Sequence, residues 1–183
     1  MIFVNPTNLP RSSNTVSMKK YCIAKSAIHG KGIFLTRDVK KDETILIFRG
    51  KEIVDPDVGH WWYNPRALQS GYAKWIVPEK GSACGYLNHC CSPTAGVKGK
   101  KRIVAMRPLK KGEEVTIDYA LSETYPLWHM RCHCKAKNCR KVVKPYQDMP
   151  AWRMKRYVNY TSQYILDMKL HLNWDEYLKS KKR

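Results

Sequence analysis

Four short motifs, far apart in the chain and in one fixed order, constrain this sequence more than any other feature. Each motif alone is weak. They are His29-Gly30-Lys31-Gly32-Ile33-Phe34, then Tyr86-Leu87-Asn88-His89-Cys90-Cys91-Ser92-Pro93, then Gly112-Glu113-Glu114-Val115-Thr116-Ile117-Asp118-Tyr119, and last Cys132-His133-Cys134-Lys135-Ala136-Lys137-Asn138-Cys139. If the fold brings these four stretches together, a basic β-rich chain becomes a candidate enzyme.

The last motif predicts a structural zinc site. It supplies three thiols within eight residues, from Cys132, Cys134 and Cys139. A structural zinc ion takes four ligands in a tetrahedron, with sulfur at about 2.3 Å, so one ligand must come from elsewhere. The residues leave several sources open, namely Cys90, Cys91, His133 or another cysteine. Nearby cations lower thiol pKa values and would leave unligated cysteines reactive, which favours the metal.

The glycine motif does not fit a dinucleotide-binding fingerprint. That fingerprint needs a third glycine and a following helix, whereas Gly30-Lys31-Gly32 is followed by Ile33-Phe34-Leu35-Thr36, which is typical of a strand. Glycines at this place let the backbone approach a ligand closely, or they simply make a turn. Taken one at a time, Asn88, His89 and Tyr119 would be ordinary structural residues.

The charge of the chain is extreme and uneven. The formal net charge is +19 in 183 residues, which predicts attraction to polyanions such as nucleic acid. A coat of solvated lysines explains the total equally well. However, residues 98–111 hold seven Lys or Arg and no acid, and residues 131–144 hold six and no acid. This clustering favours a basic patch that makes nonspecific contact with nucleic acid.

Cysteine use and hydropathy indicate an intracellular protein. The seven cysteines are an odd number, and residues 1–6 lack the basic and apolar runs of a secretory signal. Both features favour a reducing compartment, where thiols are available to a metal. No stretch approaches the about 18–20 apolar residues of a membrane helix, so we expect no membrane insertion.

Short apolar runs separated by turn signals predict a mainly β domain of α+β class, built from several small sheets. The expected strands cover residues 21–24, 33–36, 44–48, 52–54, 73–77, 103–106 and 115–117. Residues 34–45 and 104–115 read alike as strand, basic turn, strand, and we interpret them as two solutions to one local geometry. Residues 55–71, around Trp61-Trp62-Tyr63, predict an irregular or briefly helical insertion.

The two ends of the chain differ from this β pattern. Residues 1–17 are polar and predict a flexible arm. Beyond Pro150, apolar side chains recur near helical spacing with Lys and Arg between them, which predicts one amphipathic helix that packs on the domain. These apolar residues are Trp152, Tyr157, Tyr160, Tyr164, Ile165, Met168 and Leu172.

In combination, the four motifs resemble those of SET-domain protein lysine methyltransferases with a post-SET zinc segment. The resemblance covers about residues 18–143 and rests on the order Gly-x-Gly, Asn-His-x-Cys-x-Pro, Gly-Glu-Glu-x-x-x-Asp-Tyr and Cys-x-Cys-x4-Cys. It implies a SET-type fold of small sheets with a short helical insertion, in which residues 88–93 and 112–119 thread past each other in a knot-like core. It divides the chain into an arm (1–17), a SET domain (18–121), a post-SET zinc segment (122–144) and a C-terminal helical tail (145–183).

The resemblance also implies roles for single residues. Tyr119 falls on the active-site tyrosine. The positions that match cofactor-binding residues are Gly30, Lys31, Gly32, Asn88 and His89. The positions that match the ligands of one structural zinc ion are Cys91, Cys132, Cys134 and Cys139. The cofactor implied is S-adenosylmethionine.

Several positions depart from the family pattern. Gly85-Tyr86 stands where an arginine and an aromatic residue are usual, and Thr94 replaces an asparagine. Ile117 stands where Phe or Tyr influences how many methyl groups are added, so the degree of methylation is not readable. Residues 55–85 match poorly, and no substrate-groove residue is assigned there.

The function implied is that of an S-adenosylmethionine-dependent protein lysine N-methyltransferase. Its substrate would be a histone or another basic protein that is bound to nucleic acid. The alternative is a non-catalytic, zinc-stabilised module that binds nucleic acid or nucleoprotein. Either function places the chain in a nucleus, on chromatin or in a nucleoid, and delivery into a host cell stays open.

Overall fold

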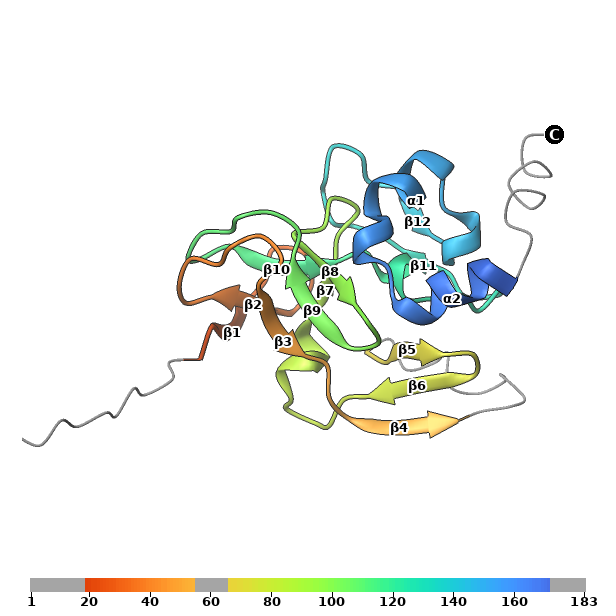
Figure 1. Cartoon of the computed structure of the whole chain (residues 1–183). Coiled ribbons are helices and arrows are strands. Elements are labelled where there is room, and N and C mark those ends of the chain that lie inside the picture. The colour runs from red at the N-terminus through yellow and green to blue at the C-terminus, as the bar shows by residue number, and fades with distance from the viewer. Residues whose placement is uncertain (1–18, 55–65, 172–183) are drawn as a thin grey trace, which may run out of the picture.

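A computed structural model describes residues 19–54 and 66–171 of the chain. The predicted arm (1–17) and the Trp61-Trp62-Tyr63 group lie outside these residues. Within them, most of the regular structure is β, arranged in four small sheets, with two short α-helices in the last part (Figure 1). None of the helices found in the described ranges is long and apolar enough to cross a membrane.

The central sheet holds parts of three motifs. It has the order β1 (Tyr21–Lys25), β2 (Lys31–Leu35), β10 (Glu114–Ile117) and β7 (Asn88–His89). Strand β10 is antiparallel to β2 and parallel to β7. Ile33 of β2 lies opposite Val115 of β10, and both side chains are fully buried. Burial of these apolar residues therefore fixes the register that aligns the glycine, Asn-His and Asp-Tyr motifs.

Three further sheets surround the central one. One has the order β3 (Thr44–Ile47), β9 (Arg102–Ala105) and β8 (Ala95–Lys98), and another has the order β4 (Lys51–Val54), β6 (Lys74–Val77) and β5 (Leu68–Gly71). The last pairs β11 (Met130–Arg131) with β12 (Val142–Val143). The mainly β fold of small sheets is confirmed.

The second motif lies directly against β10. The N–H of Cys90 donates to the carbonyl of Ile117 at 3.0 Å, and the N–H of Thr94 donates to the carbonyl of Thr116 at 3.2 Å. These bonds extend the short β7–β10 pairing on both sides of Cys91. Both ends of the segment 88–94 therefore contact Thr116 and Ile117 of β10, and Cys91 lies in the bend between them. The threading of a knot stays a prediction.

All seven expected strands are present, with ends that differ by one or two residues. The strands that the sequence pattern did not predict are β5, β7, β8, β11 and β12. Three of these have two residues each, which is too short for any periodicity. Strand β8 contains Gly96, where a Cβ atom would lie 2.5 Å from the Cβ of Tyr160. A close approach by the C-terminal segment, which the local sequence cannot show, thus explains this glycine.

The prediction that residues 55–71 form an irregular or briefly helical insertion is wrong for the last four of these residues. Residues 68–71 form strand β5, which pairs with β6, in place of an irregular or helical segment. Gln69 is buried there, and its side-chain oxygen accepts from the N–H of Thr124 at 2.8 Å. A hydrogen bond across 55 positions therefore stabilises a strand that its own four residues do not specify.

The two similar turns of the chain contact each other. Val39 and Leu109 occupy equivalent places in them, form an isolated antiparallel bridge and are both buried. Each turn also holds the same ion pair, between Arg37 and Glu43 in one and between Arg107 and Glu113 in the other. Equal local geometry thus accounts for the repeated sequence.

The prediction of one long C-terminal helix is also wrong. Helix α1 (Ala151–Tyr157) is separated from α2 (Gln163–His171) by a short 3-10 turn and an extended link. The break lets the N–H of Ser162 donate to Leu121 and the N–H of Gln163 donate to Gly99, both at 2.8 Å. Tyr157, Tyr164 and Ile165 still face a core, as their helical spacing predicts. That core includes several cysteines, so α1 and α2 pack beside β11 and β12 (Figure 1).

Candidate active site and metal centre

One cavity of about 760 Å³ brings residues of all four motifs together. It opens between residues 28–31 (the glycine turn), strand β7, the residues after β10, and residues 128–134 (the cysteine segment). The motif residues that line it include Gly30, Lys31, Asn88, His89, Tyr119, Cys132, His133 and Cys134. Four stretches that are remote in sequence therefore surround one space, which is within the usual size range of small-molecule sites.

Asn88 holds the glycine turn against β10. Its side-chain amide donates to the Glu114 carboxylate at 2.8 Å and to the Lys31 carbonyl at 3.1 Å. The other oxygen of Glu114 accepts from the Ser26 hydroxyl at 3.0 Å. Asn88 is nearly buried, so these bonds are well shielded from water. The network fixes the shape of residues 26–31 at the mouth of the cavity.

The two glycines of the first motif serve different purposes. Gly30 has φ +51°, in the left-handed region, and open space where its side chain would be. Gly32 has no such dihedral requirement, but a Cβ atom there would lie 2.2 Å from a carboxylate oxygen of Glu114 and 3.1 Å from the Asn88 amide nitrogen. Gly30 therefore permits the turn, and Gly32 leaves room for the Asn88–Glu114 pair.

His89 links the cavity to the cysteine cluster. Its Nδ1 accepts the backbone N–H of Tyr119 at 3.2 Å, so a neutral ring carries its proton on Nε2, which lies 3.4 Å from the Cys91 sulfur. Burial, together with the positive charges of Arg140 and Arg153, lowers the pKa of His89 to about 3. The imidazole is thus neutral at physiological pH, and its 3.7 Å approach to Asp118 is not an ion pair.

Tyr119 presents a protonated phenol to the cavity. Its hydroxyl donates to the carbonyl of Leu87 at 2.8 Å, and its ring meets the His89 ring edge to face at a centroid distance of 5.3 Å. Burial raises the pKa of the Tyr119 phenol well above its usual value, against a smaller opposite effect of Arg66. The group is therefore a hydrogen-bonding group of fixed orientation and not a base.

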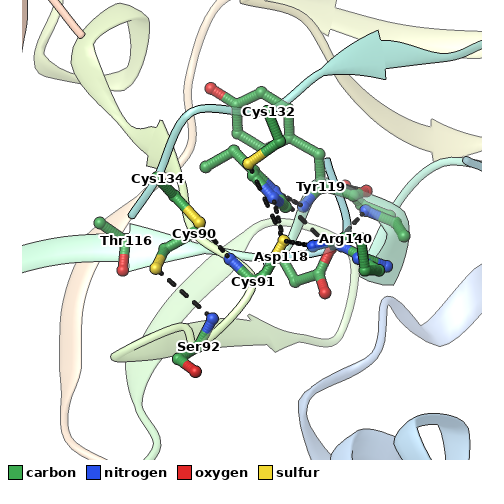
Figure 2. A network of polar contacts seen from close by, with 12 residues as sticks. Cys90, Cys91, Ser92, Thr116, Asp118, Tyr119, Cys132, Cys134 and Arg140 are labelled. Carbon is green, nitrogen blue, oxygen red and sulfur yellow. Dashed lines mark hydrogen bonds and ion pairs between the residues drawn. The ribbon is translucent and has the colours of Figure 1, made fainter. Parts of the chain in front are cut away.

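Four cysteines form a candidate metal centre next to this cavity. The sulfur atoms of Cys91, Cys132, Cys134 and Cys139 all lie within 4.8 Å of one another. Those of Cys91 and Cys132 are 3.8 Å apart, and Figure 2 shows them together with Cys134. A tetrahedron with bonds of about 2.3 Å has edges of about 3.8 Å. The four side chains thus fit a zinc ion with only small adjustments.

Of the fourth ligands that the sequence left open, Cys91 belongs to this group, and Cys90 and His133 do not. The Cys90 sulfur accepts from the N–H of Ser92 at 3.4 Å (Figure 2) and also interacts with the Cys134 thiol at the edge of the group. His133 is exposed at the cavity wall. The backbone N–H groups of Cys91 and Arg140 donate to sulfurs of the cluster, and such hydrogen bonds orient and stabilise bound thiolates.

Two arginines, the buried Arg153 and the partly buried Arg140, connect this cluster to the rest of the fold. Arg140 pairs with the fully buried Asp118, whose carboxyl pKa is raised by burial while Arg140 opposes that effect. Arg153 of α1 donates to the Cys91 carbonyl at 2.6 Å and to the Asn138 carbonyl at 3.1 Å. Helix α1 is therefore attached to both halves of the cysteine cluster.

Comparison with known proteins agrees with these motifs. Residues 30–120 match the family model described as "SET domain". The chain belongs to the SET-domain family. A histone-lysine N-methyltransferase, H3 lysine-4 specific, of Candida albicans is 32% identical over 143 residues, which cover 69% of this chain and 14% of that protein.

Two animal proteins give similar matches to this SET-domain chain. Histone-lysine N-methyltransferase trithorax of Drosophila melanogaster is 29% identical over 160 residues, covering 75% of this chain and 4% of that protein. Human histone-lysine N-methyltransferase 2B is 29% identical over 136 residues, covering 66% of this chain and 5% of that protein. The chain thus spans only a small part of the length of these relatives.

Some residues of the SET-domain site were not singled out from the sequence. They are Ser26, Glu114, Arg140 and Arg153. Only Glu114 had a signal, because it belongs to the Gly-Glu-Glu motif. The others act through contacts with residues that are remote in the sequence, so their positions in the chain carried no information on their partners.

The basic clusters of the SET-domain chain are partly neutralised. Lys98 pairs with Asp42, Lys110 with Asp38 and Arg107 with Glu113, at 3.0, 2.8 and 2.6 Å. Lys100 and Lys101 lie in the turn between β8 and β9, Arg102 begins β9, and all three are exposed. Contact with nucleic acid stays a prediction, which rests on these remaining cations.

Proposed function

We propose that this chain is an S-adenosylmethionine-dependent protein lysine N-methyltransferase. The observation that carries the proposal is the single cavity in which the glycine turn, Asn88, His89 and Tyr119 meet beside four clustered cysteines. The relatives named as histone-lysine N-methyltransferases support the same reaction.

The residues present fit the proposed cofactor. Gly30, Lys31, Asn88 and His89 line one part of the cavity, and the Asn88–Glu114 bond keeps the backbone of the turn in place. When bound, S-adenosylmethionine supplies a methyl group on a positively charged sulfur, which is the electrophile of the reaction. A backbone held in advance loses little entropy when a ligand binds, which favours tight and oriented binding.

The proposed role of Tyr119 is to orient the lysine amine. A lysine must lose its proton before it can attack, although its free pKa is about 10.4, and a site that excludes water favours the neutral amine. The Tyr119 hydroxyl proton is held by the Leu87 carbonyl, so the phenol oxygen offers lone pairs to an incoming N–H. This interaction would align the amine, and alignment is the main requirement of a direct displacement.

The proposed role of the metal is structural. Cys91, Cys132, Cys134 and Cys139 would hold one zinc ion and so attach the segment around β11 and β12 to the SET domain. Residues 128–134 contribute a wall of the cavity. The ion would therefore complete the site without contacting the reacting groups.

Gly32→Ala should weaken both the fold and cofactor binding. The added methyl group would overlap the Glu114 carboxylate, and overpacking of this kind costs about 1–3 kcal/mol. Relief of the overlap would displace the Asn88 network, with about a tenfold loss of affinity for each 1.4 kcal/mol. Urea unfolding and calorimetric titration with S-adenosylhomocysteine measure the two effects.

Gly81→Ala is the matched control for this substitution. Gly81 has φ +83° and open space at its Cβ position, and it does not line the cavity. Its alanine variant should lose stability but keep normal cofactor affinity. Equal affinities of the Gly32→Ala variant and the unaltered protein would contradict the proposed role of the turn.

The proposed substrate is a histone or another basic protein bound to nucleic acid, and the proposed place of action is the nucleus and its chromatin. The names of the relatives support a histone. The exposed cations near residues 100–102 would grip nucleic acid and so bring a cationic enzyme to a cationic substrate. The alternative, a zinc-stabilised module that only binds nucleoprotein, requires no cofactor in the cavity.

Methyl transfer to core histones tests the proposed function. We expect mass spectrometry to find isotope-labelled methyl groups on histone lysines after incubation with labelled cofactor. Nucleosomes should be the better substrate, with an advantage that falls steeply as salt rises. No labelled lysine on free histones or on nucleosomes would reject the proposal in favour of the binding module.

A further inference from the structure

Arg153 is a buried arginine in helix α1, beyond the residues that match the SET-domain family model. It is 2% exposed, and its guanidinium donates to the carbonyl of Cys91 at 2.6 Å and to the carbonyl of Asn138 at 3.1 Å. The guanidinium carbon also lies 4.8 Å from the centre of the Trp152 ring. A buried charge is costly unless it is bonded and balanced, so the two carbonyl bonds and the surroundings of this arginine indicate a specific role.

The two carbonyls that Arg153 binds belong to opposite halves of the cysteine cluster. Cys91 follows β7 in the SET domain, whereas Asn138 immediately precedes Cys139 in the post-SET segment. A guanidinium is a rigid planar fork, so two carbonyls bonded to it are fixed relative to each other. Arg153 therefore holds the backbone of one candidate ligand and of the residue next to another.

The charge of Arg153 is also suited to this place. A divalent ion with four thiolate ligands has a net negative charge, which hydrogen bonds and nearby cations stabilise. Arg140 already pairs with Asp118, whereas no ion pair joins Arg153 to a carboxylate among the described residues. The positive charge of Arg153 is thus available to balance the metal centre.

A second contact between side chains of the two halves lies at the surface. The Ser92 hydroxyl donates to the side-chain oxygen of Asn138 at 2.7 Å, but this pair is exposed to water. Water competes with exposed hydrogen bonds, so their net contribution is small. Arg153, in contrast, links the same two halves from a buried position.

We propose that Arg153 is a positioning residue that joins the two halves of the metal centre and so holds the cysteine segment as a wall of the cavity. That segment, residues 128–134, lines the cavity and contains two of the four clustered cysteines. The wall serves catalysis only if the proposed function is correct, and to that extent the inference rests on it. Helix α1 would then be a working part of this enzyme, although it lies outside the matched residues 30–120.

The affinity for zinc tests this role without methyl transfer. Zinc-loaded protein is titrated with a chelator of known affinity. Loss of an outer hydrogen-bonding partner lowers metal affinity about 10–100-fold, so we expect Arg153→Met to bind zinc about 30-fold more weakly than the unaltered protein. Arg153→Lys keeps the charge but loses the planar fork, and we expect about a tenfold loss.

Hydrogen exchange at saturating zinc tests the position of the wall itself. Residues 128–134 should exchange faster in Arg153→Met than in the unaltered protein, even with the metal site filled. Equal exchange rates in this segment would show that the metal alone positions it and would overturn the inference.

Three control variants separate this role from a general loosening of the region. Arg156→Met removes an exposed arginine from the same helix, and Ser92→Ala removes the exposed contact with Asn138. Met154→Ala leaves a cavity beneath α1, because Met154 is buried in the core that contains the cysteines, and it should lower the unfolding midpoint. We expect each control to change zinc affinity less than threefold.

The inference is overturned if Arg153→Met binds zinc as tightly as the unaltered protein, or if Met154→Ala loses as much zinc affinity as Arg153→Met. Full zinc affinity of Arg153→Lys would overturn it too, because charge alone would then suffice, and this variant decides if Arg153→Met does not fold. The titration involves neither cofactor nor substrate. Normal zinc binding by an active Arg153→Met therefore rejects this inference alone, and the expected zinc affinities in a chain without methyl transfer reject the proposed function alone.

Discussion

Tyr119→Phe should lower the rate of methyl transfer about 10²–10³-fold while the fold and the metal content stay unchanged. The range is that of removing one hydrogen-bonding group that acts on the reacting atoms. Phenylalanine keeps the ring contact with His89 but loses the hydroxyl that Leu87 holds at 2.8 Å. The stability loss should be only about 1 kcal/mol, as for one intramolecular hydrogen bond. Single-turnover rates with bound histone and cofactor measure the effect on chemistry.

Tyr160→Phe is a matched control. The Tyr160 hydroxyl also donates to a backbone carbonyl, that of Met106 at 3.3 Å, but Tyr160 does not line the cavity. This variant should therefore show a similarly small stability change and a normal rate. If both variants were fully active, Tyr119 would have no catalytic role.

Removal of the metal should abolish the activity and loosen the C-terminal part of the SET-domain chain. Zinc binding by structural cysteine sites provides on the order of 10 kcal/mol of apparent free energy at neutral pH. The segment 122–144 contains little regular structure, because β11 and β12 have two residues each. Cys91, Cys132 and Cys134 also belong to the core that contains Tyr157, Tyr164 and Ile165. Chelation, or Cys134→Ser, should thus increase hydrogen exchange in β11, β12 and both helices.

Cys22→Ser controls for the loss of a thiol. Cys22 is exposed on β1 and lies outside the cysteine cluster, so its serine variant should retain one zinc ion per chain and normal protection from exchange. Normal exchange in β11 and β12 after complete zinc removal would contradict a structural role of the ion.

The sequence predicted most of the strands correctly, but it did not predict strand β5 or the break in the C-terminal helix. Strands such as β2 and β10 carry their own signal, since Ile33, Val115 and Ile117 are apolar residues that the core buries. Strand β5 and the break between α1 and α2 depend instead on bonds to Thr124, Leu121 and Gly99. These partners are remote in the sequence, so no local pattern could reveal them.

The residues of the site likewise fall into those that a motif identifies and those that only the folded structure reveals. The glycine turn, Asn88, His89, Tyr119 and the four cysteines were all named from motifs, and the structure brings them to one cavity and one cluster. The groups that hold them, such as Ser26 and Arg153, are single residues without a motif.

A crystal structure with zinc and S-adenosylhomocysteine is the most direct test of the arrangement as a whole. We expect one anomalous zinc peak within bonding distance of Cys91, Cys132, Cys134 and Cys139, and the ligand in contact with the turn at residues 29–32 and with Asn88. Its sulfur should face the Tyr119 hydroxyl. A ligand bound elsewhere, or a cysteine cluster without zinc in a zinc-saturated crystal, would contradict the account.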